Sequence, residues 1–296
     1  MPSHITFDRV DAVIGAEVYG LGLDQVPNEK SIAVLEQALE KYGVLIFRKQ
    51  EVTPRQLVEF SRPFAPLALA PREEDRHKDH PEIFVIGNPE GKQVVFAPDV
   101  TNSEIDDMEL EWHTDHSQYS IPARATILLG EEVPAKGGDT AFACTYTAYD
   151  ALSAAEKRQY ENVTLLHSVR GLNDYLRRLN KLETLNSHEL DLEKEPPQKW
   201  PLVRRHPLSG RRALYFGSHM SIGVDGLPEA EGRALIKKVT AHATRPEFQY
   251  RHRWQKGDVL FWDNRRLIHA ATPYDTTIHR RVIYRTTLEE VAPVVM

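Results

Sequence analysis

The fold is decided by one stretch near the C-terminal end of the chain, FQYRHRWQKGDVLFW (residues 248–262). Aromatic and histidine side chains at positions 248, 250, 252 and 254 alternate with polar ones, which is the period of a half-buried strand. Lys256 and Gly257 then turn the chain, and residues 259–262 form an apolar strand. Strands separated by turns, without a regular βαβ rhythm, predict an antiparallel, mainly β core with helices packed outside it.

The first part of the chain adds strands and helices to this core. Residues 5–21 are rich in Val, Ile, Phe and Tyr, and they predict one or two strands. Ser31 is expected to cap a helix that Gly43 stops, and residues 44–47 then form a short buried strand. Thr53 and the proline after it start a second helix.

The rest of the sequence predicts a single domain over residues 1–296 with two lid-like insertions. These insertions lie near residues 67–111 and 171–198, where the sequence is polar, charged and poorly periodic. Ser153, with a glutamate three residues later, predicts a capping box at the start of a helix. One more helix is expected over residues 228–243, between the strands of the last third.

Composition excludes several kinds of partner. The 296 residues carry a net charge of -6 with both signs interspersed, so no basic face is expected for nucleic acid. No apolar run approaches the roughly 18 residues that span a bilayer. Residues 1–10 lack the pattern of a signal peptide, so we expect a cytoplasmic protein without membrane contact. Cys144 is the only cysteine, which excludes intrachain disulfides and thiolate clusters, and we expect it to be buried.

The sharpest local motif is WHTD at residues 112–115. In an extended segment, residues two apart point to the same side, so His113 and Asp115 can offer a nitrogen and an oxygen to one metal ion. Alone, the motif is weak, because such triplets occur often by chance and are usually an ordinary surface pair. A third ligand on the same face of the metal leaves the opposite face open for substrate and oxygen. His269 fits that position, with a packed or hydrogen-bonded histidine as the alternative.

Two arginines near the C-terminal end strengthen this interpretation. Arg281 and Arg285 are four residues apart, so on a strand they face the same side with Cα atoms roughly 13 Å apart. Buried arginines need anions, and a dicarboxylate bound at the metal supplies them. Arg281 can hold its distal carboxylate in a bidentate fork, while Arg285 lies nearer the metal. The alternative is a pair of solvated arginines on a surface strand.

These residues resemble the taurine and dichlorophenoxyacetate dioxygenase family of iron(II)- and 2-oxoglutarate-dependent enzymes. The resemblance runs over most of the chain and is densest at WHTD, at the GGDT turn of residues 137–140 and over residues 254–287. WPLVR at 200–204 and YRHRW at 250–254 look particularly like the dichlorophenoxyacetate branch. Several matches in the right order are far more specific than any one of them.

The resemblance implies a double-stranded β-helix, or jelly-roll, whose mouth holds Fe(II). It implies that 2-oxoglutarate and O2 are consumed while a small anionic substrate is hydroxylated, in this branch an aryloxyalkanoate with cleavage of its ether. By position, the family's iron ligands match His113, Asp115 and His269, and its 2-oxoglutarate contacts match Thr140 and Arg281. We also expect a homo-oligomer, either a dimer or a tetramer.

Three further residues are expected near the substrate. Arg285 matches an arginine beside both the cosubstrate and the substrate, and Lys92 matches a lysine that approaches the substrate carboxylate. Glu109 departs from the family, which carries an asparagine there, and an acid in the pocket repels an anion unless it is paired or protonated. An amino-acid derivative or a sulfonate therefore stays open as the substrate.

Two hypotheses of another class use the same residues. A zinc hydrolase would use the three ligands and a metal-bound water, but it leaves Thr140, Arg281 and Arg285 without a role. A non-catalytic β-barrel binding protein would use the arginines to hold an anion. Dependence of oxygen uptake on both iron and 2-oxoglutarate separates all three hypotheses.

Overall fold

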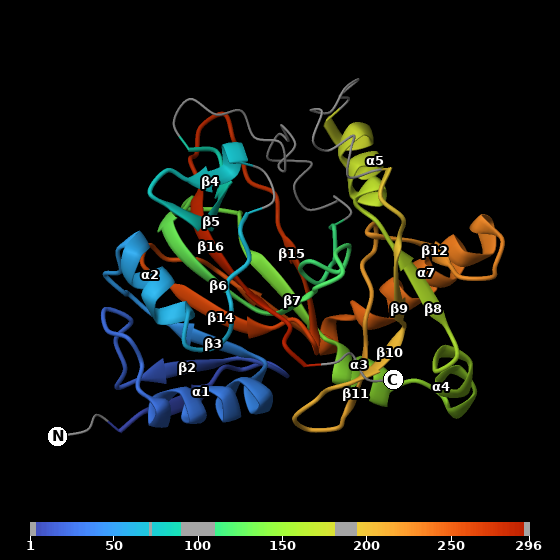
Figure 1. Cartoon of the computed structure of the whole chain (residues 1–296), viewed down its shortest axis with the longest axis horizontal. Coiled ribbons are helices and arrows are strands. Elements are labelled where there is room, and N and C mark those ends of the chain that lie inside the picture. Colours follow the sequence, from blue (N-terminus) through green and yellow to red (C-terminus); the bar gives the residue numbers. More distant parts are fainter. Residues whose placement is uncertain (1–3, 71–72, 90–109, 181–193, 293–296) are drawn as a thin grey trace.

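The computed structural model describes residues 4–70, 73–89, 110–180 and 194–292, and its centre is a pair of facing β-sheets (Figure 1). The larger sheet runs in the order β1 (Thr6–Arg9), β2 (Ala16–Tyr19), β3 (Val44–Phe47), β14 (Val259–Asp263), β6 (Ala123–Glu132), β16 (Val282–Glu289), β5 (His80–Gly87) and β4 (Arg76–His77). The smaller sheet runs in the order β13 (Gln249–His252), β7 (Thr140–Cys144) and β15 (Leu267–Ala271). Among the described strands, the one parallel pair is β2 with β3.

The two sheets enclose a shared core because successive side chains along a strand point to opposite faces of its sheet. On β14, Leu260 and Trp262 face the smaller sheet, where they pack with Phe142. The intervening Val259 and Phe261 face the opposite side of the larger sheet. This sandwich is the mainly β core that the sequence predicts and is consistent with a jelly-roll, and each sheet has a further apolar face to cover.

Helices cover both outer faces of the sandwich, α1 and α2 on one side and α7 on the other (Figure 1). The six described α-helices are α1 (Glu29–Tyr42), α2 (Pro54–Ser61), α3 (Thr145–Asp150), α4 (Ala154–Tyr160), α5 (Val169–Asn180) and α7 (Glu229–Ala243), and the 3-10 turns are η1 (Glu73–Asp75) and η2 (Pro246–Phe248). A third sheet, in the order β12 (Ser221–Val224), β8 (Thr164–His167) and β9 (Gln198–Pro201), and the hairpin β10 (Val203–Arg205) with β11 (Arg212–Leu214) lie beside the smaller sheet. No helix in the described part is long and apolar enough to cross a membrane.

Local capping signals locate the helix ends with one exception. Thr53 starts α2 as predicted and forms a capping box there, Ser153 forms the predicted capping box, and Gly43 ends α1 with φ at 78°. The prediction that Ser31 caps α1 is wrong. The helix starts earlier because the side chain of Asn28 accepts the backbone N–H of Ser31, so Ser31 is the third helical residue.

Two strand boundaries also differ from the prediction. The alternation that begins at Phe248 is only partly a strand, because Phe248 closes η2 and β13 starts at Gln249. Arg281 lies immediately before β16 and not on it. The reason is that Asn88 occupies both of its backbone groups: its side chain accepts the Arg281 N–H, and its own N–H donates to the Arg281 carbonyl.

The two predicted insertions contain more regular structure than their composition indicates. Within the first, β4 and β5 join the larger sheet beside β16. The second begins with α5, which runs to Asn180. The lid role of both segments remains a prediction, since residues 90–109 and 181–193 lie outside the described part. Cys144 is buried, as expected.

Candidate metal centre

The structure brings His113, Asp115 and His269 together at the mouth between the two sheets. His113 and His269 form an isolated antiparallel bridge in which each backbone N–H donates to the other's carbonyl, at 2.9 and 2.8 Å. One ligand atom from each of the three residues lies within 4.8 Å of the other two. In the described part of the chain, no other group of three His, Cys, Asp or Glu residues is arranged in this way.

Asp115 is an ionised carboxylate although it is almost wholly buried. Thr126 donates to Oδ2 at 2.6 Å, and Arg285 donates to Oδ1 at 3.0 Å through Nη1. Burial alone raises the pKa of Asp115, but the positive charge of Arg285 leads the interactions that outweigh it and lower the pKa below its ordinary value. The site therefore holds a negative charge at the point where a cation would bind.

The two histidines present their Nε2 atoms to this carboxylate. Nε2 of His113 lies 3.8 Å from Oδ1 and Nε2 of His269 lies 3.9 Å from Oδ2 of Asp115. Burial, and then the charge of His113, lowers the pKa of His269 to about 3, so it is neutral. Burial also lowers the pKa of His113, but the carboxylate of Glu111 outweighs it and raises that pKa to about 9. A metal ion that binds Nε2 of His113 displaces the proton held there.

Asn264 holds this arrangement together from the end of β14, and the sequence analysis did not assign it a role. Its Oδ1 accepts the indole N–H of Trp262 at 2.9 Å and the backbone N–H of Asp115 at 3.4 Å. Its Nδ2 donates to the Thr126 hydroxyl at 2.8 Å, and that hydroxyl in turn donates to Asp115. The resulting network ties the carboxylate to the larger sheet.

The predicted 2-oxoglutarate contacts lie on either side of the turn at residues 137–140. Arg281 is buried, and its Nε donates to the Gly138 carbonyl at 3.0 Å, while its terminal nitrogens bond no residue in the described ranges. Burial lowers its pKa to about 10, so the guanidinium stays charged at neutral pH. Thr140 accepts the indole N–H of Trp254 at 3.0 Å. A buried cation without a carboxylate partner creates a strong demand for an anion.

Both glycines of that turn are needed for this close approach. Gly137 and Gly138 have φ values of 75° and 65°, which residues with a side chain rarely adopt. A Cβ on Gly137 would lie 2.6 Å from the Pro273 carbonyl oxygen. A Cβ on Gly138 would lie 2.9 Å from Cγ of Pro134 and 3.1 Å from Cδ of Arg281. The turn therefore sets the position of the Arg281 side chain.

The residues predicted near the substrate are only partly described. Arg285 lies with its guanidinium over the Phe84 ring, 4.6 Å from the ring centroid, and its Nη1 is committed to Asp115. Its buried Nε has no partner among the described residues. Lys92 and Glu109 lie outside the described residues, so their predicted roles stay predictions.

Two neighbours of the metal cluster were missed by the sequence analysis. Glu111 places Oε2 at 2.6 Å from Nδ1 of His113. His116 follows Asp115 with φ at 58°, and its buried Nε2 has no partner in the described part of the chain. The period-two rule that pairs His113 with Asp115 also puts Glu111 on their side, so it could have been found. The unusual backbone at His116 has no signal in the sequence.

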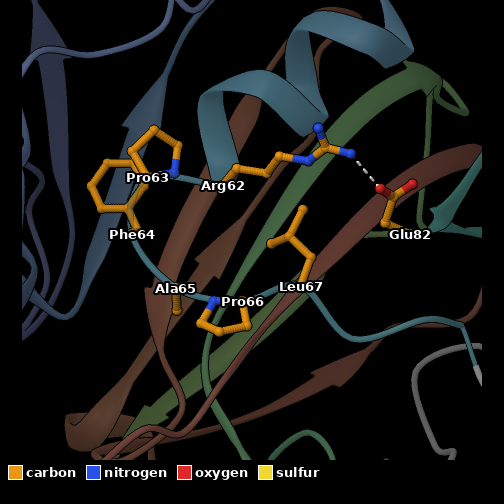
Figure 2. A pocket seen from close by; sticks show the side chains of 7 residues that line it. All are labelled: Arg62, Pro63, Phe64, Ala65, Pro66, Leu67 and Glu82. Atoms are coloured by element: carbon orange, nitrogen blue, oxygen red, sulfur yellow. Dashed lines mark hydrogen bonds and ion pairs between the residues drawn. The ribbon is translucent and has the colours of Figure 1, made fainter.

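A hollow at the end of α2 is separate from this centre (Figure 2). It measures about 550 Å³ and is lined by Arg62, Pro63, Phe64, Ala65, Pro66, Leu67 and Glu82. Its charged groups are Arg62 and Glu82, which pair with each other at 2.6 Å. The hollow therefore presents no ligand set and no unpaired acid or base.

Comparison with known proteins agrees with this geometry. Residues 5–287 match the family described as Taurine catabolism dioxygenase TauD, TfdA family. The chain belongs to this family. It is 33% identical over 281 residues to the alpha-ketoglutarate-dependent 2,4-dichlorophenoxyacetate dioxygenase of Cupriavidus pinatubonensis, covering 94% of this chain and 96% of that protein. It is 31% identical over 279 residues to the (S)-phenoxypropionate/alpha-ketoglutarate-dioxygenase of Sphingobium herbicidovorans, covering 94% of this chain and 92% of that protein.

A solved structure of AAD-2 in complex with Mn(II) and N-oxalylglycine superimposes with a TM-score of 0.79 at 28% identity, covering 99% of this chain and 100% of the other. This TauD/TfdA protein is thus an alpha-ketoglutarate-dependent dioxygenase, a class that uses Fe(II), 2-oxoglutarate and O2. The predicted enzyme class is confirmed. Family membership decides against both the zinc hydrolase and the non-catalytic binding protein.

Proposed function

We propose that this dioxygenase hydroxylates a small organic acid at a centre where His113, Asp115 and His269 hold Fe(II). The observation that carries the proposal is the meeting of these three side chains around one point between the sheets. Two imidazoles and one carboxylate are the donor set of non-haem iron oxygenases, which leave the remaining positions open. The ionised, buried Asp115 fits a cation, because a metal ion there would add to the positive charge of Arg285 that already stabilises the carboxylate.

Arg281 and Thr140 are proposed to bind 2-oxoglutarate. The buried guanidinium of Arg281 offers two terminal nitrogens to the distal carboxylate, in the planar fork that suits such a group. Thr140 keeps its hydroxyl hydrogen for an acceptor, because the oxygen already accepts from Trp254. When bound, iron and 2-oxoglutarate would supply the oxidising chemistry together with O2: one oxygen atom of O2 would enter a substrate C–H bond, and the other would enter the succinate that forms as the cosubstrate loses CO2.

The proposed substrate is an aryloxyalkanoate, whose hydroxylation beside the ether oxygen leads to ether cleavage. Support comes from the substrates named for the two curated relatives and from the cation at Arg285, which lies over an aromatic ring beside Asp115. Lys92 is proposed as a second contact to the acid. Glu109 is the residue that would instead favour an amino-acid derivative, and a sulfonate is the third candidate.

Three further proposals complete this assignment. The chain acts as one domain over residues 1–296, with the segments near 67–111 and 171–198 serving as lids. It works in the cytoplasm as a homo-oligomer, either a dimer or a tetramer. Light scattering on the purified protein tests the oligomeric state, and a monomer would contradict it.

Succinate release tests the function. Purified protein is supplied with Fe(II) and 2-oxoglutarate and offered aryloxyacids, sulfonates and N-substituted amino acids. We expect aryloxyacids to raise succinate release above the uncoupled background. His113→Ala, Asp115→Ala and His269→Ala should each abolish turnover and weaken iron binding, since two ligands hold the metal insufficiently. His4→Ala is the control, because His4 is exposed near the N-terminal end and lies outside both proposed lid segments. Full activity and full iron content in any ligand variant would remove that residue from the centre.

A further inference from the structure

We infer that Glu111 is a positioning residue for the metal, and that its carboxylate strengthens divalent-cation binding through His113. This inference rests on the proposed function, in which His113 is an iron ligand. It assigns a role to a side chain that neither touches the proposed metal position nor belongs to the predicted ligand set.

Glu111 contacts His113 directly and through two acceptor atoms. Nδ1 of His113 lies 2.6 Å from Oε2 of Glu111 and 3.0 Å from the backbone carbonyl oxygen of the same residue. Nδ1–H donates to this pair of acceptors, so the other ring nitrogen, Nε2, is the one directed at Asp115. The carbonyl fixes the ring orientation, and the carboxylate adds a negative charge behind the ligand, which makes it a better donor to a cation.

The second histidine has no such support. Nδ1 of His269 is buried and has no hydrogen-bond partner in the described part of the chain. Its ring is instead held by packing, with centroids 4.7 Å from Trp262 and 6.1 Å from Phe142. Among the described residues, Glu111 is therefore the one that places a carboxylate at the Nδ1 side of an imidazole ligand.

The other carboxylate oxygen shows why this arrangement favours a cation. Oε1 of Glu111 is buried and bonds none of the described residues, so the side chain's bonds go to His113 and to no other element. A carboxylate buried with half of its acceptors unused is costly in free energy. Positive charge at the metal position offsets that cost. A side chain placed only to stabilise the fold would instead reach a donor on a neighbouring strand or loop.

Glu111→Gln separates the charge from the shape. The amide oxygen can still accept from Nδ1, and the backbone carbonyl is untouched, so ring orientation is kept while the negative charge is lost. Co(II) is titrated into the metal-free protein and followed by its visible absorption. We expect Kd for Co(II) to rise on the order of tenfold to a hundredfold. Glu111→Asp, whose carboxylate is one carbon too short to reach Nδ1, should weaken binding as well.

Two further measurements distinguish this role from a structural one. The increase in the unfolding midpoint that Co(II) produces should be smaller in Glu111→Gln than in the wild type. Glu59→Gln is the matched control, because Glu59 lies on the surface in an ion pair with Arg55 at 2.8 Å. Its Kd for Co(II) should equal that of the wild type.

Each outcome has a definite reading. Glu111→Gln and Glu111→Asp with Kd within twofold of the wild type would overturn the inference. If in addition His113→Ala abolishes Co(II) binding, the proposed metal centre stands and only the role of Glu111 fails. If His113→Ala binds Co(II) like the wild type, the centre itself is wrong.

Discussion

Replacing Gly138 by alanine should disturb 2-oxoglutarate binding although no residue proposed to bind the metal or the cosubstrate is itself substituted. Gly138 has φ at 65°, and a Cβ there would lie 3.1 Å from Cδ of Arg281 and 2.9 Å from Cγ of Pro134. The Arg281 side chain is the more movable of the two neighbours, and its Nε bonds the carbonyl of the same glycine. The added methyl group must therefore displace the guanidinium by a few tenths of an ångström.

The chain offers a control with the same backbone strain and no contact. Gly210 has φ at 67°, and a Cβ on it would meet nothing within 4 Å. Left-handed backbone costs alanine about 1–2 kcal/mol, and the stiffer unfolded chain returns roughly 0.4–1 kcal/mol. Gly210→Ala should therefore lower the free energy of unfolding by about 1 kcal/mol. Overpacking adds about 1–3 kcal/mol at Gly138 alone.

The assay compares these two variants in urea unfolding and in steady-state kinetics. For Gly138→Ala, we expect a KM for 2-oxoglutarate roughly tenfold higher, since about 1.4 kcal/mol is lost when one bond of the carboxylate fork is misaligned. The KM for the primary substrate should change far less, and Gly210→Ala should leave both values alone. Equal kinetic effects in the two variants would refute the view that the turn positions Arg281.

Three other substitutions have expected outcomes. Arg281→Lys keeps the charge but loses the planar fork, so the KM for 2-oxoglutarate should rise about tenfold or more, and an equal rise for the primary substrate would contradict the assignment. Burial lowers the pKa of His167 from 6.5 to about 3. The neutral imidazole therefore contributes to the free energy of unfolding above pH 6.5, and this contribution is lost as the pH falls. In urea unfolding of the metal-free protein, this residue should lower the free energy of unfolding by about 2 kcal/mol between pH 7 and 5. If the free energy of unfolding of His167→Gln depended on pH as strongly as that of the wild type, the prediction would be wrong. Asp263→Asn leaves the buried Arg265 without its counterion, which should cost about 3–5 kcal/mol of unfolding free energy in the same assay, whereas a loss below 1 kcal/mol would show that the pair is dispensable.

Sequence patterns predicted much of the fold wherever an element depends on residues that are close together in the sequence. The capping boxes at Thr53 and Ser153 involve residues three apart, so the sequence contains both partners. Ser31 failed as a cap because Asn28 competes for the same role, and the extended backbone at Asn28 decides between them. The end of the strand at Arg281 depends on Asn88, which is 193 residues away along the chain. No pattern near Arg281 contains that information.

The same distinction applies to the site. His113 and Asp115 were found together because a two-residue spacing in an extended segment has one geometric meaning. The network that holds Asp115 joins Thr126 to Asn264 across 138 residues, so it depends on the register between β6 and β14. Register follows from the packing of whole sheets, and sequence periodicity alone leaves it open.

The geometry of Arg285 shows how one residue can serve both the metal site and an acid substrate. Its Nη1 donates to Asp115, and its Nε and Nη2, which form the side face of the guanidinium, bond no residue in the described part of the chain. That face is the fork which binds a carboxylate through two parallel hydrogen bonds. The Phe84 ring covers one flat side of the same guanidinium and restricts approach to the edge. Because Nη1 fixes the orientation against Asp115, an acid held on the free edge would lie at a set distance from this proposed metal ligand, as the proposed hydroxylation beside the iron requires.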